Sequence, residues 1–141
     1  MNPIILAAFA GMTLAGLPAL SLAACAAPSV RVATALAMTT LLQGNTACVP
    51  ALTQPTMEAQ ELHQTDGTLF DYKRGPGHLG DPSAQVGSWK VTGGPRAVVT
   101  HDYGGGVRYT YELWNNNDGT HSFCSANPEV KARIKTGGGP C

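Results

Sequence analysis

The sequence predicts an all-β fold, in which a small antiparallel up-and-down meander closes into a barrel or half-barrel. The first observation is a series of short segments in which apolar and polar residues alternate, spaced roughly ten residues apart. The second is the number of turn-forming residues, with 17 Gly and 10 Pro among 141 residues. The third is that every aromatic residue except Phe9 lies between Phe70 and Phe123. One domain is therefore expected, with its core in that stretch.

The chain begins with an apolar segment that predicts an N-terminal signal helix. Residues 4–27 carry no charge, and their side chains form the apolar run of an export signal. Ala24, Cys25 and Ala26 then supply the small-x-small pattern of a cleavage site. The sequence therefore predicts a signal peptide over residues 1–26, cut after Ala26, and a periplasmic or secreted protein.

Two alternatives stay open for this segment. Residues 22–25 fit a bacterial lipobox, in which Cys25 would be acylated and would make the protein a membrane-anchored lipoprotein. The segment is nearly long enough for a transmembrane helix, but Pro18 and the lack of Lys or Arg before Arg31 disfavour one. A membrane is therefore expected as a partner only through the signal or a lipid on Cys25.

The rest of the chain divides into a short connection and a β-domain. Residues 27–40 are rich in Ala, Thr and Val and predict a linker or a short helix between Val30 and Met38. The β-domain is expected over residues 41–141, with turn signals such as Asp66-Gly67 between its strands. The expected strands are Leu41–Val49, Met57–Gln64, Thr68–Arg74, Gln85–Thr92, Arg96–Tyr103, Val107–Trp114, His121–Ser125 and Val130–Lys135.

Residues 107–114 form the clearest of these strands. Val107, Tyr109, Tyr111 and Leu113 share one face, and polar side chains occupy the other. Consecutive strands joined by hairpin turns make an up-and-down sheet, and such a sheet removes its exposed edges by closing. The expected shape is a small lipocalin-like or streptavidin-like barrel, and a β-sandwich is the alternative.

The cysteines are Cys25, Cys48, Cys124 and Cys141. Cleavage after Ala26, or acylation, removes Cys25 from pairing and leaves an odd thiol. An oxidising compartment favours one disulfide among the remaining three. We expect Cys124–Cys141, because the glycine-rich tail lets Cys141 fold back, with Cys48 as the alternative partner.

Several short motifs lie along residues 41–125: Leu42-Gln43-Gly44-Asn45-Thr46, Gln60-Glu61-Leu62-His63, Asp71-Tyr72-Lys73, Asp81-Pro82 and Val86-Gly87-Ser88-Trp89. Together they resemble the motifs of small exported bacterial domains of unknown function. In that family a Leu-x-Gly-Asn-Thr strand opens the fold and a Val-Gly-x-Trp strand lies in mid-domain. The resemblance implies an exported β-domain and carries no activity.

Charge and motif spacing exclude several function classes. Nine Lys and Arg balance nine Asp and Glu, so no basic face is expected for a nucleic acid. No serine lies in a Gly-x-Ser-x-Gly elbow. The histidines His63, His78, His101 and His121 lack metal-ligand spacing, although a barrel could bring His101 and His121 together. No catalytic residue, metal or cofactor is therefore expected.

Aromatic side chains are the best candidates for ligand binding. Trp89, Tyr109 and Tyr111 are expected on adjacent strands, where they fill the core or line a pocket of an open barrel. The loop that contains Arg74 and His78 is the local basic cluster and a second candidate contact. We expect Trp89 and Tyr109 to be buried on neighbouring strands.

These observations favour an exported, non-catalytic module that binds a small apolar ligand or an envelope or extracellular protein. The alternative is an exported hydrolase or metal-dependent enzyme. One geometric feature separates the two hypotheses. Two or more of His63, His101, His121 and the acidic residues within hydrogen-bond reach in one cleft would favour the enzyme, whereas scattered positions would favour the module.

Overall fold

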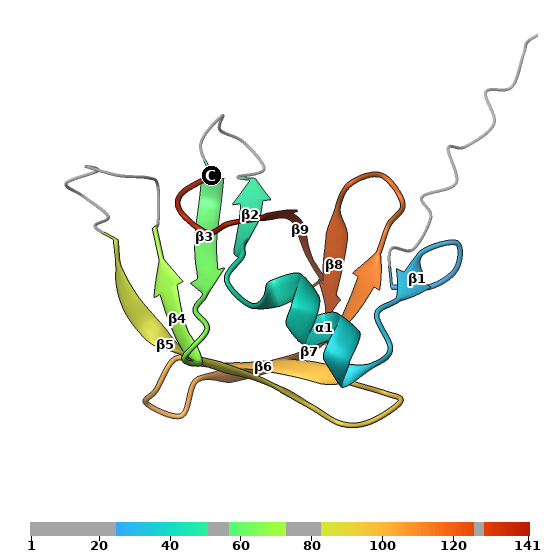
Figure 1. Cartoon of the computed structure of the whole chain (residues 1–141), viewed down its shortest axis with the longest axis horizontal. Coiled ribbons are helices and arrows are strands. Elements are labelled where there is room, and N and C mark those ends of the chain that lie inside the picture. Colours follow the sequence, from blue (N-terminus) through green and yellow to red (C-terminus); the bar gives the residue numbers. More distant parts are fainter. Residues whose placement is uncertain (1–24, 51–56, 73–82, 126–128) are drawn as a thin grey trace, which may run out of the picture.

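The computed structural model describes residues 25–50, 57–72, 83–125 and 129–141. The described residues form one helix, α1 (Ala35–Leu42), and the strands β1 (Val30–Arg31), β2 (Thr46–Pro50), β3 (Met57–His63), β4 (Thr68–Asp71), β5 (Ala84–Thr92), β6 (Val98–Asp102), β7 (Arg108–Asn115), β8 (His121–Cys124) and β9 (Val130–Lys135). From β2 to β9 each strand pairs with the next in antiparallel orientation, and the pairing of β2 with β9 closes an eight-stranded barrel (Figure 1). The additional strand, β1, pairs with β7.

The predicted all-β barrel and its up-and-down strand order are confirmed. The sheet closes on itself, so it does not split into the two facing sheets of a β-sandwich. All eight predicted strands are present, but the first begins at Thr46 and not at Leu41, because the helix occupies the residues before it. The strand β1 was not predicted, because two residues are too few to show a period.

Helix α1 begins after Thr34, whose Oγ1 accepts a hydrogen bond from the backbone N–H of Ala37 at 3.2 Å. Met38 and Leu42 lie one turn apart on the same face of the helix and are fully buried in the barrel core. The helix packs against β5 and β6. Burial of this apolar face therefore extends the helix beyond the predicted end at Met38.

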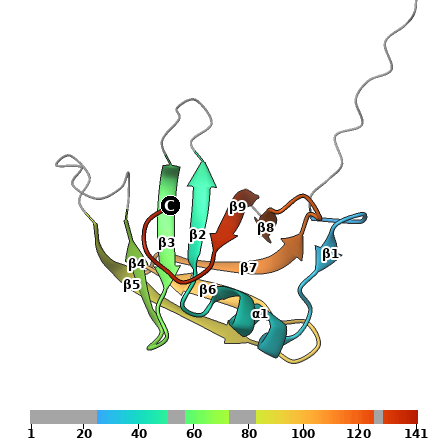
Figure 2. The ribbon, with the colours of Figure 1, turned by 45° about the horizontal axis from the view of Figure 1, so that its top comes forward.

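The two ends of the barrel differ. In an up-and-down barrel, β2, β4, β6 and β8 finish at the end where β3, β5, β7 and β9 begin. We call this the distal end, because α1 leads into the start of β2 and lies at the opposite end (Figure 2). The helix therefore covers one end of the core, while the distal end carries no described helix.

Gly87 on β5 lies where two strands approach closely. A Cβ atom at this position would lie 2.1 Å from the carbonyl oxygen of Asp102, which is an overlap that no side chain tolerates. The glycine of the Val86-Gly87-Ser88-Trp89 motif is therefore required by the packing of β5 against β6.

The structure contains two disulfides, Cys25–Cys124 and Cys48–Cys141, each with Cα atoms 6.0 Å apart. The predicted Cys124–Cys141 pair is wrong, and its alternative partner Cys48 holds Cys141 instead. Strand β9 lies between β2 and β8, and the tail that follows it returns over β3, where the backbone N–H of Cys141 donates to Gln60 Oε1 at 2.6 Å. This path brings the tail to Cys48 and away from Cys124.

The predicted odd thiol is also wrong, because Cys25 pairs with Cys124 and no cysteine is free. The signal peptide over residues 1–26 and the alternative acylation of Cys25 stay predictions, and either of them would remove Cys25 from this disulfide.

Two disulfides indicate an oxidising, non-cytoplasmic location. The predicted signal helix falls mostly on residues 1–24, which lie outside the described residues. In the part of the chain that the structure describes, no helix has the length and apolar character needed to span a membrane.

Candidate functional site

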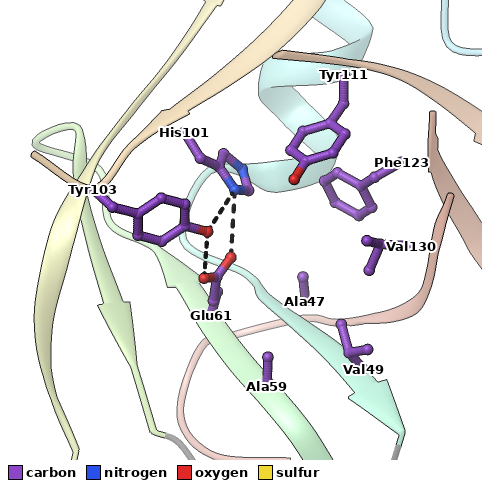
Figure 3. A pocket seen from close by; sticks show the side chains of 9 residues that line it. All are labelled: Ala47, Val49, Ala59, Glu61, His101, Tyr103, Tyr111, Phe123 and Val130. Carbon is purple, nitrogen blue, oxygen red and sulfur yellow. Dashed lines mark hydrogen bonds and ion pairs between the residues drawn. The ribbon is translucent and has the colours of Figure 1, made fainter. Parts of the chain in front are cut away.

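A cavity of about 230 Å³ lies within the barrel, toward the distal end (Figure 3). Strand alternation explains its wall, because residues two apart on one strand face the same side, as Ala59 and Glu61 do on β3. Most of the wall is apolar or aromatic, and one region is polar. The lining residues are Ala47, Val49, Ala59, Glu61, His101, Tyr103, Tyr111, Phe123 and Val130.

The polar region consists of Glu61, His101 and Tyr103, which we call the Glu61 cluster. Tyr103 Oη donates a hydrogen bond to Glu61 Oε1 at 2.6 Å. His101 Nδ1 lies 3.4 Å from Glu61 Oε2 and 3.3 Å from Tyr103 Oη (Figure 3). Strands β3 and β6 are not neighbours in the sheet, so these side chains meet across the barrel interior. The closed fold therefore assembles a carboxylate, an imidazole and a phenol at one place.

His63 extends this cluster into the core. It lies two residues after Glu61 on the same face of β3 and is fully buried. Its Nε2 atom lies 3.0 Å from His101 Nε2, and its ring contacts Trp89 edge to face with centroids 5.1 Å apart. Its Nδ1 atom is buried without a hydrogen-bond partner. Burial and the nearby His101 lower the pKa of His63 to about 3, so His63 is neutral at neutral pH.

Glu61 keeps its negative charge at neutral pH. Burial alone raises the pKa of this carboxyl, but hydrogen bonding and charge interaction with His101, together with the Tyr103 hydroxyl and His63, outweigh burial and hold the pKa below its usual value. Burial and the Glu61 charge raise the pKa of Tyr103 far above its usual value and that of Tyr111 to about 12. Both phenols therefore stay protonated and can donate hydrogen bonds.

The proximity that would favour an enzyme is present, because His63, His101 and Glu61 lie in one connected group. However, both ring nitrogens of His101 face groups of the protein, and His63 does not line the cavity. A general base must place a free acceptor atom within reach of a substrate proton. Among these groups, the carboxylate of Glu61 meets this condition. The geometry therefore suits recognition of a ligand better than proton transfer by a histidine.

The predicted ligand-binding residues do not lie together in one site. Tyr111 lines the cavity. Trp89 is buried at 8% exposure, but it does not line this cavity, and its Nε1–H donates to the carbonyl of Gln64 at 2.9 Å. Tyr109 is 45% exposed, and β6 separates its strand from that of Trp89, so the prediction that both are buried on neighbouring strands is wrong for Tyr109. Arg74 and His78 lie outside the described residues.

The partner of His101 also differs from the one expected. His121 lies on β8 and is half-buried, and the ring that meets His101 belongs to His63. Glu61 and Phe123 were not predicted as site residues. The alternation of Ala59, Glu61 and His63 along one strand is the signal that could have found the first of them.

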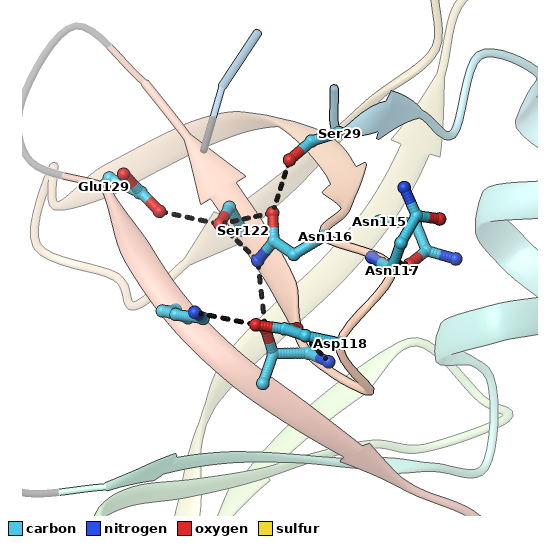
Figure 4. Close-up of polar contacts among 9 residues, drawn as sticks. Ser29, Asn115, Asn116, Asn117, Asp118, Ser122 and Glu129 are labelled. Atoms are coloured by element: carbon cyan, nitrogen blue, oxygen red, sulfur yellow. Dashed lines mark hydrogen bonds and ion pairs between the residues drawn. The ribbon is translucent and has the colours of Figure 1, made fainter. Parts of the chain in front are cut away.

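A second polar cluster surrounds Ser122 on β8 (Figure 4). Ser122 is fully buried, and its hydroxyl donates to Glu129 Oε1 at 2.6 Å and accepts from Asn116 Nδ2 at 2.9 Å. Ser29 Oγ donates to Asn116 Oδ1 at 3.0 Å and so connects the N-terminal segment to the β7–β8 hairpin. These contacts anchor backbone segments, and they do not present the serine as a nucleophile beside a histidine.

A pH titration should reveal the buried neutral His63. Because its pKa in the folded protein is about 3 and that of an unfolded histidine is about 6.5, the unfolded chain binds more protons between these values. The free energy of unfolding should therefore fall as the pH falls, by about 2 kcal/mol between pH 7.5 and pH 5. Urea unfolding at each pH measures this slope. His63→Gln should flatten the slope by that amount, and equal slopes in the two proteins would contradict the assignment.

Comparison of the chain with known protein families, with curated proteins and with solved structures finds no match. The geometry of the cavity is therefore the observation that bears on function.

Proposed function

We propose that the protein is an exported binding module that holds a small, mainly apolar ligand in the cavity of its barrel. The observation that carries this proposal is the cavity itself, with apolar walls and one polar region, the Glu61 cluster. Ligand sites typically combine an apolar lining with a few polar groups that orient the ligand. The volume of about 230 Å³ lies below the roughly 300–1,000 Å³ of sites for drug-sized molecules, so the ligand is small.

Export to the periplasm or beyond is part of this proposal. The uncharged apolar segment at residues 4–27 supports a signal, and the two disulfides support an oxidising destination. Since the Cys25–Cys124 disulfide needs Cys25, we place the cleavage on the N-terminal side of that residue. Ser21, Leu22 and Ala23 offer small residues at the spacing that a cut after Ala23 requires.

Filling the cavity should abolish ligand binding while the fold is retained. Ala59 lines the cavity from β3, and Ala59→Leu would place additional carbon atoms in the space that a ligand needs. Titration with indole, followed by NMR shifts of the Ala47 and Ala59 methyl groups, should show saturable binding to the unmodified protein. Ala59→Leu should lose this binding.

The matched control is Ala84→Leu, which adds the same group at an exposed position at the start of β5. It should bind indole as the unmodified protein does. If a panel of small apolar probes leaves the cavity methyl groups unshifted, or if Ala59→Leu binds equally well, the cavity is not a ligand site.

The second candidate function is an exported hydrolase, and the contact of Glu61 with His101 is the observation that favours it. Turnover of an activated acetyl ester by the folded protein, lost in His101→Gln and retained in His121→Gln, would support it. Equal rates in all three proteins would exclude a role of His101 in such a reaction.

A further inference from the structure

We infer that the ligand of this cavity carries a small organic ammonium group, which sits against the carboxylate of Glu61 and the aromatic rings beside it. The inference rests on the proposed function, because it names the chemical class of the ligand for the same cavity. Three features of the described residues support it: the charge of the wall, the arrangement of its rings and the contacts still open to Glu61.

The charge of the wall favours a cation. Glu61 is acidic, and the described residues that line the cavity include no Lys or Arg. An anionic ligand would meet the carboxylate without a fixed positive charge to compensate. A neutral apolar ligand would take water away from the carboxylate and give no charged partner in return. A cation adds a charged partner to the contact that Glu61 already makes with His101.

The aromatic rings form a corner around the same place. Tyr111 and Phe123 lie perpendicular to each other with centroids 5.7 Å apart. The ring of His101 lies 5.5 Å from that of Tyr111 and 6.0 Å from that of Phe123, and its Nδ1 atom also contacts Glu61 (Figure 3). Ring faces attract ammonium groups, and cages of aromatic residues are the usual recognition element for methylated ammonium ions. Tyr111 comes from β7 and Phe123 from β8, so neighbouring strands hold the corner rigid.

The carboxylate retains capacity for a further partner. The two oxygens of Glu61 offer about four acceptor sites for hydrogen bonds. Tyr103 occupies one of these sites through a short hydrogen bond of 2.6 Å. The contact with His101 Nδ1 is longer, at 3.4 Å. The side chain of Glu61 is 16% exposed, so it is reached from the cavity without disruption of the fold. The Tyr103 and His101 contacts fix the position of the carboxylate, and its remaining acceptor sites are free to face an ammonium group.

Choline and 3,3-dimethylbutan-1-ol test the inference, because they have nearly the same shape and differ in charge. Isothermal titration with the full chain should give an affinity for choline about tenfold or more above that for the alcohol, as a cation–π contact and a charge pair together predict. The anionic analogue 3,3-dimethylbutanoate should bind most weakly. Glu61→Gln should bring choline and the alcohol to similar affinities, mainly by weakening choline.

Glu112→Gln is the matched control, because Glu112 lies on β7 with its ion pairs to Arg31 and Arg96 and does not line the cavity. It should keep the preference for choline. Tyr111→Leu provides a second variant that leaves Glu61 in place, and it should weaken choline more than the alcohol. If Glu61→Gln does not fold, this variant decides the question.

The outcomes distinguish a failure of the ammonium inference from a failure of the proposed binding function. If the alcohol binds in the cavity as tightly as choline, the ammonium inference is wrong and the proposed binding function stands. If choline, the alcohol and indole all fail to bind, or bind equally well to Ala59→Leu, the proposed function fails and the inference with it.

Discussion

Reduction of both disulfides is expected to unfold the protein at moderate temperature. The two bonds join residues 99 and 93 positions apart. In the chain-entropy account, a bond that closes a loop of about 100 residues contributes about 4.7 kcal/mol. The second bond adds less than the first, because the two loops overlap in sequence. A small domain has a total stability of about 5–15 kcal/mol, so this loss removes a large share of it. Thermal unfolding followed by circular dichroism, with and without reductant, measures the effect.

Two double variants test the contribution of each disulfide by itself. Cys25→Ser with Cys124→Ser removes the link between the N-terminal segment and β8, and Cys48→Ser with Cys141→Ser removes the link between β2 and the tail. Each should lower the melting temperature less than full reduction does. Peptide mapping of the exported protein without reduction should find Cys25 joined to Cys124. A Cys124–Cys141 peptide, or a mature chain that begins at Ala27, would contradict the pairing described above.

Trp89→Ala is expected to lower the free energy of unfolding by about 3–5 kcal/mol, the usual cost of deleting a large core aromatic ring. Trp89 is nearly fully buried on β5, and it also bonds the carbonyl of Gln64 and contacts His63. Loss of the ring would leave a void and would remove one of the two hydrogen bonds to the Gln64 carbonyl, which also accepts from the backbone N–H of Gly67. Urea unfolding followed by circular dichroism gives the difference.

Trp89→Phe and Trp114→Ala are the controls for this prediction. Phenylalanine keeps an apolar ring and loses only the indole N–H, so its cost should lie between those of the native residue and alanine. Trp114 is half-buried on β7, and its replacement should cost clearly less than that of Trp89. A change below about 1 kcal/mol for Trp89→Ala would place this side chain outside the core.

Local periodicity was sufficient to predict the barrel. Each strand pairs with the next one along the chain, so strand type and order follow largely from the pattern of neighbouring residues. The boundary of α1 was predicted less well, because the burial of Leu42 depends on strands β5 and β6 that come much later in the chain. The disulfide pairing was missed for a related reason, since it depends on the path of the tail over β3.

The candidate site could not be predicted from sequence spacing. His63 and His101 are 38 residues apart, and Glu61 and Tyr103 are 42 residues apart. They come from strands that are not neighbours in the sheet and meet only because the sheet curls. A prediction of pocket residues from aromatic composition therefore found Tyr111 and missed the carboxylate on the opposite wall.

The pairing of β2 with β9 has a consequence for the order of events during folding. Hairpins between consecutive strands can form early, because each brings together residues close in the chain. The seam between Ala47 and Ile134 can form only after all the strands between them exist. Until then β2 presents an unpaired edge to other chains. The seam should therefore be the slowest part of the sheet to acquire hydrogen-exchange protection during refolding, and the period before it closes should be when the chain is most prone to aggregate.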